Sequence, residues 1–269
     1  MKDVIKNRIS VRSYQKRPLS QDDEKTVRRI LDDVQEKKGP FGHTARFFTL
    51  PSKGEGGKYL GTYGFIKQAP YFIGGVIENS FEGMVDYGFL FEEVILRLTE
   101  KDFGTVWLGG TFKRERFEFE VDVKKGEIIP AISPVGYSAE QSMRERVLRG
   151  FTKAKTRKPY DELFFTPDLE PVAKDNVFKE YLELLRLAPS ASNKQPWRVI
   201  VEDNVFHLFL ERTEGYAKHL PTDIQAIDMG IALAHLYLPI KEDGYTSEII
   251  QNKPKDVEGW EYVISLEVN

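Results

Sequence analysis

Residues 188–197, with the sequence APSASNKQPW, have the composition of a ligand-binding turn. The segment packs small side chains, an amide pair and a fixed proline into one corner between an apolar helix (178–187) and a strand (198–202). Small side chains let a ligand approach the backbone closely, and asparagine, serine and proline favour tight turns. This composition favours a site for a planar polar ligand.

Patterns of helix and strand place this turn late in a longer series of elements. Ser20, followed by acidic residues, predicts the N-cap of a helix that runs to about Val34, with its apolar residues on one face. The other elements predicted before residue 175 are strands 47–50, 71–77 and 128–135, and a long helix, 86–99, with Gly104 as its C-cap. After residue 175 the predicted elements are helix 178–187, strands 198–202, 206–211 and 260–268, and a second long helix around Asp228.

The two parts of the chain repeat one order of elements. Each long helix contains an Asp-x-Gly triplet, at 86–88 and at 228–230, and each is followed by an acidic segment that ends at a glycine. Such a repeat of domain size indicates duplication and not a solenoid. We therefore predict two related halves, residues 1–165 and residues 166–269. Only the first contains Arg-x-Ser-x-Arg and Trp-Leu-Gly-Gly, and only the second contains the intact turn.

Composition excludes several classes of function. The net charge of −3 gives no basic footprint for nucleic acid, and the chain has no cysteine for a disulfide, a thiolate or a Cys-based metal site. The four histidines lack metal-ligand spacing, so no metal is expected. No apolar run approaches the roughly 18 residues of a membrane span, and no signal pattern opens the chain. We expect a cytoplasmic protein that binds neither nucleic acid nor membrane.

The turn at 188–197 resembles the APSxxNxQPW signature of the FMN-dependent nitroreductase family, in which it lies near the start of the chain. The whole chain resembles the fused, internally duplicated form found in the TM nitroreductase subfamily. The resemblance implies an α+β fold with central, mainly antiparallel sheets flanked by helices. Family members are homodimers with two FMN sites at the subunit interface. Here it implies a monomeric pseudo-dimer with a single site between its halves.

The resemblance also assigns cofactor-binding roles. Arg8, Ser10 and Arg12 match the N-terminal phosphate and flavin-edge motif, and in the family the backbone N–H at the position of Gly109 hydrogen-bonds flavin N5. The full set implied is Arg8, Ser10, Arg12, Leu108, Gly109, Gly110, Lys155, Arg157, Pro189, Ser190, Ala191 and Asn193. Guanidinium, ammonium and hydroxyl groups make charge-assisted hydrogen bonds to phosphate, and paired glycines let a backbone touch the flavin ring.

Each of these features also has an ordinary structural explanation. Taken singly, the arginines are surface charges, Gly109-Gly110 is a tight turn, and the basic run 155–158 is a solvated linker. Trp107 and Trp197 are expected in the core, because buried aromatic side chains dominate cores. One segment departs from the family: residues 61–67 offer only Thr62, Tyr63 or Lys67 to the flavin ring.

The function implied is an FMN-dependent oxidoreductase with a ping-pong cycle. NAD(P)H would reduce the flavin, and a small acceptor such as a nitroaromatic or a quinone would then take the electrons. This scheme requires no side-chain acid, so we assign no catalytic residue. The altered segment 61–67 motivates an alternative, a flavin-storage protein or a degenerate member without catalysis. A specialised chemistry under a substrate-covering lid is a third possibility, although the sequence identifies no lid.

Overall fold

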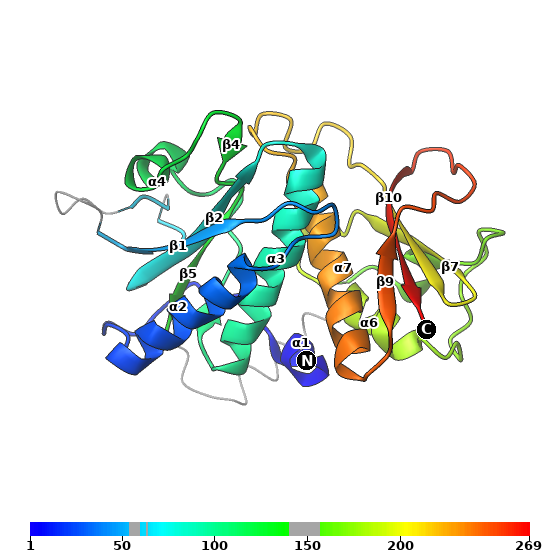
Figure 1. Ribbon diagram of the computed structural model, residues 1–269, viewed down its shortest axis with the longest axis horizontal. Helices are drawn as coiled ribbons and strands as arrows, with labels where there is room; N and C mark the ends of the chain where they lie inside the picture. The colour runs from blue at the N-terminus through cyan, green and yellow to red at the C-terminus, as the bar shows by residue number, and fades with distance from the viewer. Residues whose placement is uncertain (54–59, 63, 140–156) are drawn as a thin grey trace.

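The computed structural model describes residues 1–53, 60–62, 64–139 and 157–269. Two sheets lie on opposite sides of a central pair of long helices, α3 (Phe81–Glu100) and α7 (Ile224–Glu242) (Figure 1). The shorter helices are α1 (Lys2–Asn7), α2 (Gln21–Gln35), α4 (Arg114–Glu120) and α6 (Lys179–Arg186), with 3-10 turns η2 (Tyr160–Glu162) and η3 (Ala191–Asn193). Helix α2 begins where the sequence predicts, because the Ser20 side chain accepts a hydrogen bond from the Asp23 N–H.

The first sheet is antiparallel and has the order β1-β2-β5-β3, with β4 also paired to β2. Its strands are β1 (Arg46–Pro51), β2 (Tyr71–Glu78), β3 (Gly104–Thr105), β4 (Glu127–Ile128) and β5 (Ile132–Gly136). Strand β2 is buried along nearly its whole length. It packs α2 and α3 on one face, and an apolar cluster that includes Phe72, Val76 and Phe117 on the other.

The second sheet has the order β6-β7-β8-β10-β9. Its strands are β6 (Phe164–Phe165), β7 (Trp197–Glu202), β8 (Val205–Leu210), β9 (Ser247–Ile250) and β10 (Glu261–Val268). All its pairings are antiparallel except that of β6 with β7. Strand β6 belongs to the first predicted range, 1–165, yet it pairs in the second sheet, so the chain has already crossed over before residue 166.

The central helices touch backbone to backbone at the Asp-x-Gly triplets. A Cβ atom added to Gly88 would lie 2.1 Å from the Ile227 carbonyl oxygen, and one added to Gly230 would lie 1.9 Å from that of Val85. Neither distance is possible for a real side chain, so glycine is required at both crossing points. The contact is nearly reciprocal between α3 and α7, as expected if the two triplets occupy equivalent places in the two halves.

Some predicted boundaries were wrong for local reasons. Helix α3 begins at Phe81, capped by Ser80, and ends at Glu100. Gly104 is not its C-cap but the first residue of β3, because Asp102 takes the left-handed conformation that ends the segment. The predicted strand 128–135 is divided into β4 and β5 around Pro130, which has no N–H to donate to a sheet. Helix α4 and strands β6 and β9 were not predicted.

Candidate functional site

A pocket contains residues from both predicted halves, 1–165 and 166–269. The first half supplies Ser10, Arg12 and Gly109, with Val106, Trp107 and Ala131. The second half supplies Pro189, Ser190 and Ala191, with Ser192, Ile224, Ile227, Asp228 and Ile231. Six of the twelve predicted cofactor-binding residues therefore line one pocket, although they lie between 80 (Gly109 to Pro189) and 181 (Ser10 to Ala191) residues apart across the two groups.

Short backbone bridges place the first-half residues at the pocket. Ser10 pairs with Thr105 in a parallel bridge, and the Val11 N–H donates to the Thr105 carbonyl at 2.9 Å. Leu108 and Ile132 exchange hydrogen bonds of 2.9 and 3.0 Å, so that Gly109 follows directly from the edge of the first sheet. The side chain of Leu108 is buried and does not line the pocket.

The glycine pair faces the second half. A Cβ atom at Gly109 would lie 2.6 Å from the Cδ1 atom of Ile224, and one at Gly110 would lie 3.3 Å from Leu220. The glycines therefore allow the 109–110 backbone to pack closely against residues at the start of α7 and just before it. Gly109 lines the pocket, whereas Gly110 lies beside it.

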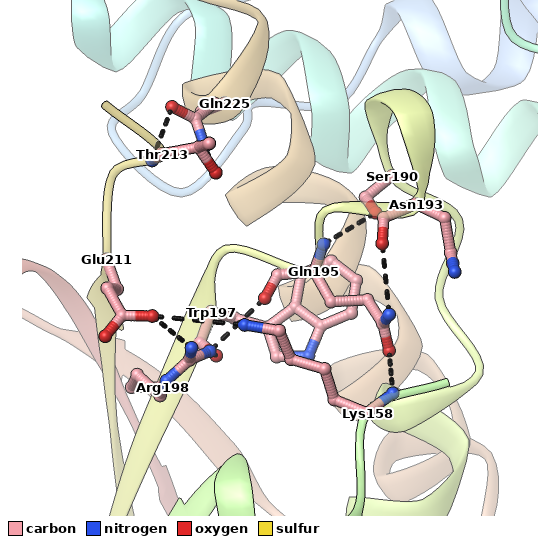
Figure 2. Close-up of polar contacts among 9 residues, drawn as sticks. All are labelled: Lys158, Ser190, Asn193, Gln195, Trp197, Arg198, Glu211, Thr213 and Gln225. Atoms are coloured by element: carbon pink, nitrogen blue, oxygen red, sulfur yellow. Dashed lines mark hydrogen bonds and ion pairs between the residues drawn. The ribbon is translucent and has the colours of Figure 1, made fainter. Parts of the chain in front are cut away.

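The turn at 188–197 has an unusual backbone held by its own side chains. Ser192, Asn193 and Gln195 have φ angles of 47°, 57° and 51°, in the left-handed region that few residues other than glycine adopt. Ser190 Oγ accepts from the Gln195 N–H at 2.9 Å, and Gln195 Nε2 donates to the Asn193 carbonyl at 3.1 Å (Figure 2). Gln195 Oε1 accepts from the Lys158 N–H at 2.8 Å, which joins the turn to the segment after residue 156.

Sequence reasoning missed a second support of the turn. Arg198, on β7, donates to the Gln195 carbonyl at 3.2 Å and pairs with Glu211, beyond β8 (Figure 2). The Lys158 ammonium group lies 3.9 Å from the same carboxylate. Trp197 is completely buried beneath these groups, as predicted. Trp107 is half-buried and packs against the core, and it also forms part of the pocket wall.

Cationic side chains gather beside the pocket. Arg157 donates hydrogen bonds to the Asn193 side-chain oxygen and, at 3.2 Å, to the Leu187 carbonyl. Burial, with the positive charges of Arg8 and Arg186, lowers the pKa of Arg157 to about 10, and Asp228 acts in the opposite direction. Arg157 Nε is buried and has no acceptor among the described residues. Three predicted residues, Arg8, Arg157 and Asn193, thus belong to one cluster, while Lys155 lies outside the described residues.

A buried carboxylate holds Trp107 in the pocket wall. Glu92, on α3, accepts from Trp107 Nε1 at 2.6 Å and lies 2.8 Å from His235 Nε2 on α7. Arg8 Nε lies 3.9 Å from the same carboxylate. These interactions keep the pKa of Glu92 low although burial opposes this, and its charge partly offsets the burial of Arg8. Glu92 and His235 therefore join the helix pair to both the pocket wall and the cationic cluster.

Asp228 was not predicted as a site residue, although the repeated Asp-x-Gly triplet marked its position. Its two carboxyl oxygens lie 3.0 and 3.1 Å from the Ala191 N–H, so that α7 holds the turn of the same half. The residue is 2% exposed, and burial raises its pKa well above the usual range. Of the segment 61–67, neither Thr62 nor Lys67 lines the pocket, and Tyr63 lies outside the described residues.

Two mainly antiparallel sheets around a central helix pair define an α+β protein of the nitroreductase-like fold. A sequence profile of the family described as "Putative TM nitroreductase" matches residues 1–240, and the chain belongs to this family. The predicted family and fold class are thereby confirmed. No curated protein matches the sequence.

The chain is similar to several solved structures, and the first of them supports the fold assignment. The chain is similar to a "putative nitroreductase" from Thermotoga maritima, with 20% identity and a TM-score of 0.59 over 99% of this chain and 92% of that one. A nitroreductase family protein from Clostridium difficile 630 has 18% identity and a TM-score of 0.44 over 60% of this chain and 95% of its own. An FMN-dependent nitroreductase from Clostridium difficile R20291 has 19% identity and a TM-score of 0.40 over 53% and 90%, respectively.

The described residues lack two kinds of feature. None of their helices has the length and apolar character needed to cross a membrane. Within the same residues, no group of three or more histidine, aspartate or glutamate side chains is arranged to hold a metal ion.

Proposed function

We propose that this protein is an FMN-dependent oxidoreductase that transfers electrons from NAD(P)H to a small acceptor such as a nitroaromatic or a quinone. The observation that carries the proposal is the pocket in which Ser10, Arg12 and Gly109 of the first half meet Pro189, Ser190 and Ala191 of the second. Family membership supports the class of chemistry, and the relative from Clostridium difficile R20291 is described as FMN-dependent. The halves, residues 1–165 and 166–269, would complete one site without a second chain.

The residues beside the pocket fit the phosphate of FMN. The positive charge of Arg8 lies close enough to Arg157 to lower the pKa of Arg157, and this repulsion is unfavourable unless an anion joins the two groups. Arg157 Nε is a buried donor with no acceptor in the described part of the chain, and phosphate would provide one. Asn193, bonded to Arg157, would fix the orientation of the guanidinium group. Lys155 is the further cation that the family pattern adds.

The remaining pocket residues fit the rest of the cofactor. When bound, FMN supplies the centre that accepts hydride from NAD(P)H and passes electrons to the acceptor. The glycine backbone at 109 allows close approach to a flat ring, and the Gly109 N–H is our candidate donor to it. Arg12, an exposed cation in the pocket wall, would stabilise negative charge that develops on reduction. Ser10 and Ser190 add hydroxyl groups, and Pro189 and Ala191 give the opposite wall small side chains.

A flavin spectrum and a titration test the proposal. After incubation with FMN and desalting, the protein should keep flavin absorbance, and binding should saturate at one FMN per chain. The chain should elute as a monomer while it retains the flavin. Saturation at two FMN per chain, or loss of all flavin on desalting, would contradict a single site between the halves.

The alternative is a flavin-storage protein without turnover. It is favoured by one observation: neither Thr62 nor Lys67 lines the pocket, so this segment gives no described side chain to the flavin ring. Anaerobic addition of NADH and of NADPH to the FMN-loaded protein distinguishes the two functions. Bleaching of the flavin absorbance, followed by its return on addition of a quinone, supports the oxidoreductase. A flavin that stays oxidised with both nucleotides supports storage.

A further inference from the structure

The two halves use equivalent aspartates differently. Asp86, on α3, accepts hydrogen bonds from the Phe41 N–H at 2.7 Å and from the His43 N–H at 2.8 Å, and the His43 ring nitrogen Nδ1 lies 2.8 Å away. Asp228, at the equivalent place on α7, has a single donor among the described residues, the Ala191 N–H, shared between its two oxygens. Asp86 therefore has three polar partners within its own half, whereas Asp228 has one among the described residues and keeps more hydrogen-bonding capacity.

The surroundings of the two carboxyl groups also differ. Asp86 is fully buried against the loop that replaces the intact turn, with the His43 ring beside it. Asp228 lines the pocket among the side chains of Ile224, Ile227 and Ile231. It therefore borders the space in which a ligand would react, and Asp86 does not.

The charges around Asp228 favour a neutral carboxyl group. Burial in this apolar wall raises its pKa, and the negative charge of Asp223, the N-cap of α7, raises it further. The Ala191 N–H and the charge of Arg157 act in the opposite direction without reversing the shift. Arg12 is the other charged residue that lines the pocket. These surroundings favour the protonated form of Asp228, whose O–H faces the pocket side of α7 and can be donated.

We propose that Asp228 is a catalytic proton donor to the acceptor that is reduced in this pocket, an inference that rests on the proposed oxidoreductase function. Reduction of a quinone to a hydroquinone adds two electrons and two protons. Bound FMN, reduced by NAD(P)H, supplies the equivalent of a hydride, which is one proton and both electrons. The O–H bond of the Asp228 carboxyl group breaks as a new O–H bond forms on the second quinone oxygen. Solvent then returns a proton to the Asp228 carboxylate.

The duplication provides a matched control. Asp228→Asn keeps an oxygen that can accept from the Ala191 N–H but removes the acidic proton, and Asp86→Asn makes the same change on α3, away from the pocket. Both variants are loaded with FMN and reduced anaerobically with NADH. They are then mixed in a stopped-flow instrument with 1,4-benzoquinone, which needs protons, or with ferricyanide, which takes electrons alone.

We expect Asp228→Asn to reoxidise about 100-fold more slowly with benzoquinone, the scale of a lost general acid, and within about twofold of wild type with ferricyanide. Asp86→Asn should match wild type with both acceptors. The wild-type rate with benzoquinone should fall as pH rises through a single ionisation that Asp228→Asn lacks.

Equal slowing of Asp228→Asn with both acceptors, with weaker FMN binding, would show that Asp228 only holds the turn, and would overturn the proposal. An unchanged rate with benzoquinone would also overturn it. Failure of the proposed function looks different, because wild-type protein would then hold no FMN or would not be reduced by NADH. That result would contradict both the oxidoreductase function and the role of Asp228, whereas the results with the two acceptors bear only on the role of Asp228.

Discussion

The Arg157 guanidinium group donates a hydrogen bond to the side-chain oxygen of Asn193. Arg157 belongs to the first predicted half, 1–165, and Asn193 to the turn of the second, so this bond joins two of the segments that the sequence assigned to one site. It also orients a cation beside Arg8, whose charge lowers the pKa of Arg157. A bound anion would relieve that repulsion. Substitution of Arg157 and Asn193 therefore tests the phosphate site directly.

Arg157 and Asn193 should be energetically coupled in FMN binding. Arg157→Ala and Asn193→Ala should each weaken binding, and the double variant should lose less than the sum of the two. A coupling of about 1–3 kcal/mol is expected for a hydrogen bond to a charged group. The dissociation constants of wild type, both single variants and the double variant, measured by quenching of FMN fluorescence, give this coupling energy. Arg28→Ala, on the exposed face of α2, is the control and should leave binding unchanged. Additive losses would mean that the two residues act at separate places.

The helix crossing should not tolerate a larger residue. Gly230→Ala would place a methyl group 1.9 Å from the Val85 carbonyl oxygen, and both groups belong to backbone that cannot easily move. We expect a loss of about 3 kcal/mol or more in the free energy of unfolding, at the upper end of ordinary overpacking. Denaturant unfolding followed by circular dichroism measures it. Glu82→Ala, at an exposed position of α3, is the control and should change stability by less than about 0.5 kcal/mol. Equal stability of the two variants would show that the helices can separate at little cost.

Gly109→Ala should affect ligand binding more than stability. Its added methyl group would meet the Cδ1 atom of Ile224, the flexible end of a side chain that can rotate away. Stability should therefore fall by about 1 kcal/mol or less. FMN affinity should fall at least about tenfold if the backbone here approaches the flavin ring. Gly110→Ala, beside the pocket and facing Leu220, is the matched variant and should bind FMN more tightly than Gly109→Ala. Tighter FMN binding by Gly109→Ala than by Gly110→Ala would show that residue 110, and not residue 109, contacts the flavin.

The sequence predicted those parts of the fold that depend on local signals. Ser20 begins α2 because a serine before acidic residues caps a helix whatever surrounds it. The Asp-x-Gly triplets predicted equivalent helices because the backbone contact at Gly88 and Gly230 tolerates no other residue. Strand β6 and the division of the predicted strand 128–135 were not recoverable in this way. Two-residue strands have no periodicity, and their pairing depends on partners far along the chain.

The same distinction applies to the site. The turn at 188–197 was recognisable because its amide, proline and small side chains are fixed by its own geometry. The role of Gln195 as a bridge between Lys158 and Asn193 depends on how two distant segments pack, which no local pattern encodes. Asp228 was visible only as one copy of a repeated triplet. The structure shows that the two aspartates differ, because two N–H groups and the His43 ring contact Asp86, whereas Asp228 faces a pocket.

The raised pKa of Asp228 should appear in the pH dependence of stability. In the unfolded chain this carboxyl group ionises near pH 3.9, whereas in the folded protein it holds its proton to a higher pH. Between these two values the folded state binds one more proton than the unfolded state, so the contribution of Asp228 to stability falls as pH rises. The slope approaches about 1.4 kcal/mol per pH unit within that window. Asp228→Asn removes this dependence. The free energy of unfolding of Asp228→Asn, relative to that of wild type, should therefore increase as pH rises from 4.5 to 7.5. Urea denaturation at each pH measures it. A constant difference between the two proteins across this range would show that Asp228 ionises normally in the folded state.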